Sequence, residues 1–159
     1  MYSWLEIEDK IKAVSAEHDL DWMLVKAFVI TESSGETGAN RYEPGWRWFL
    51  NPKDWARRLR LSTKTEWINQ ATSFGLMQVV GTVARELGFK GHIPELVFPE
   101  LGLKYGCLKL KDCIRRYPTQ LELAIASYNA GSPRYFMGKL INQSYVNKIM
   151  SLYNSFKEE

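Results

Sequence analysis

Glu32 lies at an unusual place in the sequence, at the end of an apolar run that continues into a turn, VITESSGE over residues 29–36. Burying an unpaired carboxylate is unfavourable. If residues 22–32 form a helix, Glu32 lies at the negative end of its dipole, where a charged carboxylate is disfavoured. Apolar neighbours act in the same direction, and both effects raise the pKa of the carboxyl group. A proton retained near neutrality is what a general acid needs.

The position of Glu32 by itself also fits an ordinary surface glutamate. Its carboxylate could reach water, or it could accept hydrogen bonds from Ser33 and Ser34. Taken alone, this segment favours neither the catalytic nor the surface interpretation.

Two distant stretches offer side chains that suit a sugar. Residues 73–78 read SFGLMQ and residues 126–131 read ASYNAG. Each places an amide or a phenol beside glycine, where the backbone can come close to a ligand. The amides of Gln78 and Asn129 can donate to and accept from acetamido and hydroxyl groups, and Tyr128 could bond a carboxylic acid or stack beneath a ring. Taken singly, GLMQ also fits the start of a helix and YNAG the end of one.

The elements that must position these residues are predicted to be helices joined by short loops, because apolar residues recur at helical spacing. We expect helices over residues 4–18, 22–32, 52–61, 62–71, 82–87, 99–117, 119–128 and from 144 onward. Their boundaries rest on start and stop signals, namely Asp21, Asn51-Pro52, Ser62, the T-x-x-E box of Thr119 and Glu122, Ser144, and Gly88 at a helix end. Alternating strand patterns are nearly absent, and only residues 36–50 could hold a short β-hairpin. The fold class is therefore mainly α.

Size and composition place these helices in a single domain over residues 1–159. The chain is 45% hydrophobic and 13% aromatic, which is enough for one packed core. Its formal charge of +3 is mild. The arginine-rich segments at 57–60 and 115–116 fall within helical patterns, so we interpret them as solvated helix faces and expect no nucleic-acid partner.

Export and redox signals are weak in this sequence. The N-terminal MYSWLEIEDK lacks the basic and apolar regions of a signal peptide, and no apolar run reaches the roughly 18 residues of a membrane span. Cys107 and Cys113 are six residues apart on one predicted helix, so their side chains diverge by about 240° and cannot form a disulfide. We expect reduced core thiols. Two histidines and two such cysteines give no zinc pattern, so no metal or other cofactor is expected.

In combination and in this order, the motifs are far more specific than any one of them. Glu32-Ser33, Gly75–Gln78, Tyr128–Gly131 and Tyr145-Val146 resemble the soluble lytic transglycosylase domain. The resemblance covers residues 20–155. The stretches RYEP at 41–44, SFGLMQV at 73–79 and ELGFKG at 86–91 are more similar to the compact, phage-type branch. The resemblance implies a lysozyme-like, helical fold that cleaves the glycan strands of bacterial peptidoglycan.

The resemblance also implies roles for individual residues. Glu32 matches the single catalytic acid and base. The residues expected to orient this acid or to line the glycan cleft are Ser33, Ser73, Met77, Gln78, Tyr128, Asn129 and Tyr145. Glu43, within RYEP, is added as a substrate contact.

The implied reaction uses one carboxylate, whereas most glycosidases use two. Protonated Glu32 would donate to the oxygen between N-acetylmuramic acid and N-acetylglucosamine, while the substrate's own acetamido carbonyl stabilises the cationic C1. The carboxylate would then take the proton of the C6 hydroxyl, which closes on C1 to give a 1,6-anhydro sugar. A group that acts first as acid and then as base needs a pKa near the operating pH.

Two other functions stay open. A hydrolytic muramidase of the same fold would need a second acid, for which Glu36, Glu43 and Asp54 lie in the right segment and Glu43 is the best candidate. An ion pair of Glu43 with Arg41 or Arg47, or a substrate contact, is the favoured alternative for that residue. The domain could also be a glycan-binding component of a virion or a secretion apparatus with little turnover.

The segment between the ES and GLMQ motifs is longer than the family core needs, and its tryptophans have two interpretations. They are Trp46, Trp48, Trp55 and Trp67. Indole rings stack on sugars, but tryptophan at helical spacing more often belongs to the core. We expect one or two of Trp46, Trp48 and Trp67 to be exposed toward the cleft.

The implied substrate and the N-terminal sequence point to different compartments. Peptidoglycan lies outside the inner membrane, and no signal peptide is recognised. We expect a monomer made in the cytoplasm that reaches the cell wall by export, by injection with a virion, or through lysis.

Overall fold

Residues 2–158, which the computed structural model describes, form a mainly helical fold with two small antiparallel sheets, so the predicted fold class is confirmed. The helices are α1 (Trp4–Glu17), α2 (Trp22–Ser33), α3 (Pro52–Leu59), α4 (Thr63–Gln70), α5 (Gly81–Glu86), the 3₁₀-helix η1 (Ile93–Val97), α6 (Pro99–Arg116), α7 (Leu121–Ala130) and α8 (Gln143–Glu158). The strands are β1 (Asn40–Tyr42), β2 (Thr72–Phe74), β3 (Val79–Val80), β4 (Tyr135–Phe136) and β5 (Lys139–Leu140).

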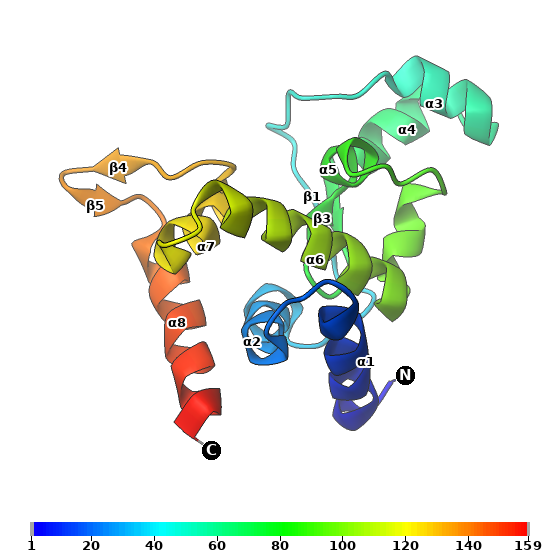
Figure 1. Cartoon of the computed structure of the whole chain (residues 1–159). Helices are drawn as coiled ribbons and strands as arrows, with labels where there is room; N and C mark the ends of the chain where they lie inside the picture. The colour runs from blue at the N-terminus through cyan, green and yellow to red at the C-terminus, as the bar shows by residue number, and fades with distance from the viewer. Residues whose placement is uncertain (1, 159) are drawn as a thin grey trace.

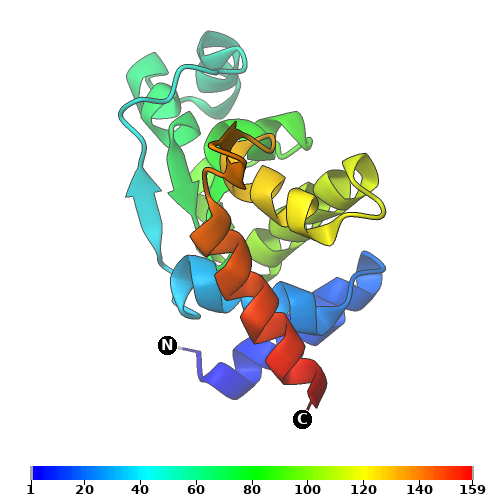
Figure 2. The same cartoon turned by 90° about the vertical axis from the view of Figure 1, so that its left-hand side faces the viewer.

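Helix α2 is the apolar centre of the fold. Its side chains Val25, Phe28 and Val29 are fully buried. Asp21 caps the helix by accepting a hydrogen bond from the Met23 amide at 2.9 Å, as predicted. Helix α8 runs beside α2, and α1 packs against both α2 and α6 (Figures 1 and 2). The C-terminal end of α2 is therefore held on several sides.

Helix α7 begins differently from the prediction. The amide of Gln120 donates to the Tyr117 carbonyl at 3.2 Å, so the chain makes a turn before the helix starts at Leu121. The capping box predicted from Thr119 and Glu122 is therefore wrong, because Thr119 lies in that turn.

Two other helix starts need smaller corrections. Helix α8 begins at Gln143, one residue before the predicted Ser144. Asn51 does precede α3, but its backbone is left-handed (φ 43°) and its side chain makes no capping bond. Pro52 occupies the first turn as expected, because its fixed φ suits that position.

The hairpin expected within residues 36–50 does not form, although a strand lies there. Strand β1 pairs with β2, with Arg41 opposite Ser73, and β2 pairs with β3, with Ser73 opposite Val80. Every residue of β2 is buried, so this strand shows no alternation of apolar and polar residues. Local periodicity could not reveal a pairing between segments so far apart in the chain.

A second hairpin, β4–β5, was not anticipated. It projects beside α7 and α8 (Figure 1), and its turn places Met137 and Gly138 at φ 49° and 79°. Strands of two residues leave no sequence pattern. Methionine is also atypical at a turn position that needs positive φ, where Asn-Gly is the usual signal.

Both cysteines are buried free thiols, as predicted, and burial raises the pKa of Cys107 to about 12. Within residues 2–158, no helix combines the length and the apolarity needed to cross a membrane. The same residues contain no cluster of three or more His, Cys, Asp or Glu side chains suited to a metal ion.

The GLMQ motif forms the tight turn between β2 and β3, and it lies directly against the rest of the core. Gly75 has φ 75°, and a Cβ there would lie 2.2 Å from the Leu96 carbonyl oxygen. On α6, a Cβ at Gly106 would lie 2.3 Å from Sδ of Met77 and 2.6 Å from its Cβ. Gly75 and Gly106 thus allow the turn to lie directly against Leu96 and α6, and these close contacts fix its position.

We expect Gly106→Ala to destabilise the protein. Overpacking costs about 1–3 kcal/mol, of which the better helix propensity of alanine offsets roughly 1 kcal/mol. Urea unfolding measures the difference. Gly38→Ala is the matched control, because nothing lies within 4 Å of a Cβ there. Equal stability of the two variants would contradict the close approach of α6 to the turn.

Candidate active site

Glu32 is half-buried in the last turn of α2, where the sequence predicted it. The helix ends at Ser33, and the left-handed backbone of Ser34 (φ 53°) then turns the chain away. The hydroxyl of Tyr145, on α8, donates a hydrogen bond to Oε1 of Glu32 at 2.5 Å. The ring of Phe28 lies edge-on to Tyr145, with centroids 6.4 Å apart. An acid at the end of one helix is thus held by a phenol from another.

The pKa of Glu32 is raised above its ordinary value, and burial is the main cause. The hydrogen bond from Tyr145 and the positive charges of Lys109, Arg41 and Lys148 act in the opposite direction. Burial and the nearby carboxylate raise the pKa of Tyr145 far above its ordinary value. The phenol therefore stays a hydrogen-bond donor throughout the pH range in which Glu32 titrates.

Lys109 is a site residue that the sequence reasoning missed. It lies on α6, and its Nζ is 3.8 Å from the centroid of the Tyr128 ring. Burial lowers its pKa, and the charge of Glu32 opposes this shift. A signal was present, because Lys109 falls in register with Gly102, Gly106 and Cys113 on the buried face of α6. A lone cation on an apolar helix face is the feature that could have identified it.

The backbone of the GLMQ turn joins the other two motifs. Tyr128 donates from its hydroxyl to the Met77 carbonyl at 2.7 Å, and the Ser33 hydroxyl lies 2.9 Å from the Leu76 carbonyl. The Gln78 amide donates to the carbonyls of Ala39 and Gly75, both at 3.0 Å. The ES, GLMQ and YNAG motifs are therefore brought together, as the resemblance implied.

Four of the predicted residues make contacts within the protein that hold the site together. Met77 is fully buried, so its side chain belongs to the core and only its carbonyl takes part in the site. Tyr128 is 2% exposed and bonds the turn rather than the acid, and Tyr145 makes the contact to Glu32 instead. Ser33 uses its hydroxyl for backbone carbonyls, including that of Val29 at 3.1 Å. These contacts position the site, and Ser33 and Tyr128 also line the hollows beside Glu32.

The remaining predicted residues face open space beside the acid. Ser73, although 2% exposed, lines a hollow of about 190 Å³ together with Glu32, Gln78 and Asn129. Asn129 is exposed and accepts a hydrogen bond from Asn142 at 3.0 Å. These side chains can meet a ligand that lies on Glu32.

The hollow at Glu32 is the middle of a longer groove. On one side it continues past Arg41 and Gln78 over the loop after α2, and on the other it continues past Trp46 and Lys109 toward the end of α7. Because adjoining hollows lie on both sides of the acid, an extended polymer can lie across Glu32.

Glu43 is the second carboxylate of the central hollow. It forms an ion pair with Arg41 at 2.7 Å, which is one of the two pairings considered from the sequence. The guanidinium of Arg41 is largely exposed, so the pair contributes little stability. Because of this ion pair, one carboxylate oxygen of Glu43 is already bonded to Arg41.

Two of these four tryptophans line the groove, and the other two pack against neighbours elsewhere. Trp46 is half-buried and Trp48 is 68% exposed, and both line the side of the groove near α7. Trp67 is 53% exposed but stacks on Phe49, with centroids 4.9 Å apart, and Trp55 packs on the guanidinium of Arg85 at 4.1 Å. The expectation that one or two tryptophans face the cleft is confirmed.

A half-buried acid in an open groove on a helical scaffold is the arrangement that acid catalysis on an extended polymer requires. The family model of the transglycosylase SLT domain matches residues 9–148, so the chain belongs to this family, whose members are lytic transglycosylases acting on peptidoglycan. The resemblance drawn from the motifs is confirmed at this level, and the phage-type branch stays a prediction. Neither curated proteins nor solved structures gave a match.

Replacing Tyr145 with phenylalanine tests the contact between α8 and the acid. Loss of the hydrogen bond raises the pKa of Glu32 further, because that bond favours the carboxylate. A general acid works below its pKa, so the alkaline limb of the kcat–pH profile should move to higher pH. We also expect kcat to fall roughly tenfold or more, because a hydrogen bond to a charged group contributes enough free energy to change a rate by that factor.

Tyr153→Phe is the control for this experiment. Tyr153 lies on the same helix but donates to Asp21 at 2.7 Å, away from the groove. Its loss should leave the pH profile unchanged. An alkaline limb that stays in place, or moves to lower pH, in the Tyr145 variant would contradict the assignment.

Proposed function

We propose that the protein cleaves the β-1,4 bond between N-acetylmuramic acid and N-acetylglucosamine and forms a 1,6-anhydro end, with Glu32 as the single acid and base. The observation that supports this most is the setting of Glu32. It is an acid with a raised pKa, hydrogen-bonded by Tyr145, in a groove that continues on both sides.

In the first step, protonated Glu32 donates its proton to the glycosidic oxygen and the bond from C1 to that oxygen breaks. The acetamido carbonyl of the substrate stabilises the positive charge on C1, so no enzyme nucleophile is needed. In the second step, the C6 hydroxyl oxygen bonds to C1, and its proton returns to Glu32. The enzyme ends in its starting state and no water is consumed.

The surroundings of Glu32 suit both of its protonation states. Burial favours the neutral acid that begins the reaction. The Tyr145 hydroxyl and the charge of Lys109 favour the carboxylate that forms in the middle of it. Opposing influences of this kind keep the pKa within reach of the working pH, which a group acting in both directions needs.

Glu32→Gln should abolish the release of glycan fragments from purified cell-wall sacculi while sparing binding. Glutamine keeps the shape and can still accept from Tyr145, but it cannot donate the proton to the leaving oxygen. Removing a general acid lowers the rate by about 10²–10⁴-fold or more. Fragment release followed by mass spectrometry measures the loss, and activity that survives would show that Glu32 is not the acid.

The pH dependence of the stability of Glu32→Gln, compared with that of the wild type, tests whether the carboxyl group of Glu32 is buried. The folded-state pKa of Glu32 is raised, so its stabilising contribution is present below the ordinary pKa and is lost as pH rises through the folded pKa. Glu32→Gln should therefore gain stability relative to wild type as pH rises. A pH-independent difference between their melting temperatures would mean that the carboxylate is solvated.

A hydrolytic muramidase is the second candidate, because Glu43 lines the same hollow as Glu32. Glu43→Gln separates the two reactions. If Glu32 acts alone, the variant still releases fragments with anhydro ends, because Arg41 already engages Glu43 in a structural pair. Loss of release, together with reducing ends from the wild type, would assign Glu43 as a base that activates water.

The location and assembly of the protein belong to the same proposal. It acts on the cell wall as a monomer, after export, injection or lysis. A low-turnover component of a virion or secretion apparatus would bind sacculi and release no fragments, with wild type and Glu32→Gln behaving alike.

A further inference from the structure

We propose that the loop over residues 46–50 forms a second saccharide-binding site beside Glu32, with Trp46 and Trp48 as its aromatic wall and Thr82 and Gln70 as the residues that position it. The proposal rests on the glycan substrate proposed above. It assigns a role to the long segment between the ES and GLMQ motifs. The reaction at Glu32 itself requires no residue of that loop.

The site is a hollow of about 540 Å³ that adjoins the one at Glu32. The two hollows share five lining residues along their common border, Trp46, Val80, Lys109, Tyr128 and Asn129. Its walls combine apolar surface with polar side chains that can bond hydroxyl and acetamido groups, as is typical of small-molecule sites of this size. These polar residues are Glu86, Lys109, Asn129, Ser132 and Arg134. A ligand that fills both hollows must be extended, as the next sugar units of a glycan strand are.

The aromatic wall is a pair of indoles that meet edge to face. The centroids of Trp46 and Trp48 lie 5.5 Å apart with the rings 72° to each other. Trp48 remains 68% exposed although it is among the largest apolar side chains of the protein. An exposed indole fixed by a neighbour offers its flat face to the apolar face of a pyranose ring at little entropic cost.

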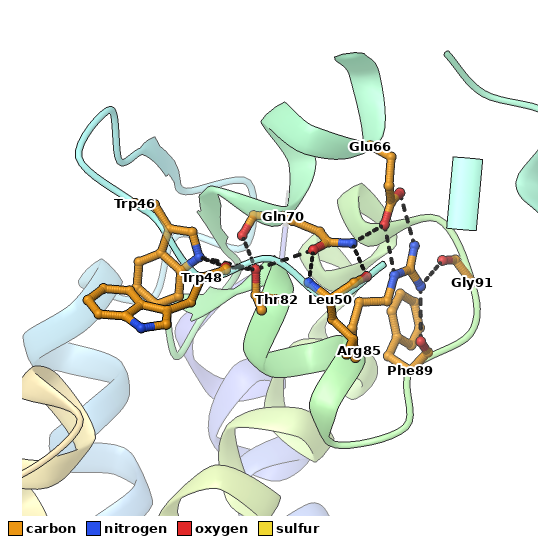
Figure 3. Close-up of polar contacts among 9 residues, drawn as sticks. All are labelled: Trp46, Trp48, Leu50, Glu66, Gln70, Thr82, Arg85, Phe89 and Gly91. Atoms are coloured by element: carbon orange, nitrogen blue, oxygen red, sulfur yellow. Dashed lines mark hydrogen bonds and ion pairs between the residues drawn. The ribbon is translucent and has the colours of Figure 1, made fainter. Parts of the chain in front are cut away.

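Thr82 fixes the tryptophan end of the loop (Figure 3). Its hydroxyl accepts a hydrogen bond from Nε1 of Trp46 at 3.1 Å and lies 2.9 Å from the Trp48 carbonyl. The same oxygen lies 3.0 Å from the Gln70 carbonyl. A single hydroxyl on α5 thus connects both tryptophans to α4.

Gln70 fixes the other end of the loop. Its side-chain oxygen accepts from the Leu50 amide at 2.8 Å, and its side-chain nitrogen donates to the Leu50 carbonyl at 3.0 Å. That nitrogen also donates to Glu66 at 2.9 Å. The amide of Gln70 therefore pairs with the loop as a neighbouring strand would.

Behind Gln70 lies an ion pair that is closed to solvent. Glu66 and Arg85 have fully buried side chains, with Nε to Oε1 at 3.0 Å and Nη2 to Oε2 at 3.2 Å. Arg85 also donates to the carbonyls of Phe89 and Gly91 (Figure 3). Such a pair gives little net stability compared with apolar residues of the same size, but it defines one geometry. In this protein that geometry sets the position of the tryptophan loop.

Trp48→Ala tests the wall, with soluble glycan strands as substrate. Contacts made equally in the bound state and the transition state lower KM without changing kcat. We expect KM to rise about tenfold with kcat unchanged, and binding of the same strands in the Glu32→Gln background to weaken equally. Phe98→Ala is the matched control, because Phe98 is also an exposed aromatic side chain but lines none of the hollows along the groove. Equal KM values for both variants would overturn the site.

Thr82→Val tests the positioning role, since valine keeps the shape and removes the hydroxyl. We expect a several-fold rise in KM, unchanged kcat, greater quenching of tryptophan fluorescence by acrylamide, and recovery in Thr82→Ser. A wild-type KM in Thr82→Val, beside a raised KM in Trp48→Ala, would overturn the positioning role alone. Fragments without anhydro ends would overturn the proposed reaction, whereas dependence of binding on Trp48 would still establish the site.

Discussion

The site depends on two carbonyl groups in the turn between β2 and β3. The carbonyls of Leu76 and Met77 lie within hydrogen-bond distance of the hydroxyls of Ser33 and Tyr128, which come from α2 and α7. These bonds tie two helices, far apart in the chain, to one turn whose own shape is set by its close contact with α6. Because both carbonyls belong to backbone inside the core, the bonds also satisfy acceptors that would otherwise be buried without partners.

Once the end of α2 is fixed in this way, Glu32 has little freedom to reach water. Its burial would favour a permanently neutral acid, and Tyr145 and Lys109 counter that tendency with a hydrogen bond and a positive charge. Lys109 is itself partly desolvated, so the carboxylate and the ammonium each favour the charged form of the other. The pKa of the acid is thus set by a balance between burial, which raises it, and groups on α6 and α8, which lower it.

The sequence was most informative where local physics determines the structure. The apolar run of α2, its Asp21 cap and the position of Glu32 all depend on neighbouring residues, and they were predicted correctly. The three motifs were also correctly expected to meet. Which tyrosine contacts the acid was not predicted, because Tyr128 and Tyr145 are both plausible partners for a carboxyl group. Only the packing of α8 against α2 decides that Tyr145 reaches it.

The segment between β1 and β2 shows the opposite case, in which no local signal exists. The buried contacts of Glu66 with Arg85, and of Gln70 with Leu50, are polar pairings across loops and helices that no periodicity reveals. From the sequence alone, Glu66, Gln70 and Arg85 would each be expected at the surface. Their burial means that α3, α4 and the tryptophan loop form one unit, closed by hydrogen bonds instead of by a large apolar core. A groove wall built in this way can vary in shape without disturbing the turn that holds Glu32, because the two use different bonds. The acid and the wall beside it are therefore separable parts of the same site, and changes in substrate binding need not alter the chemistry.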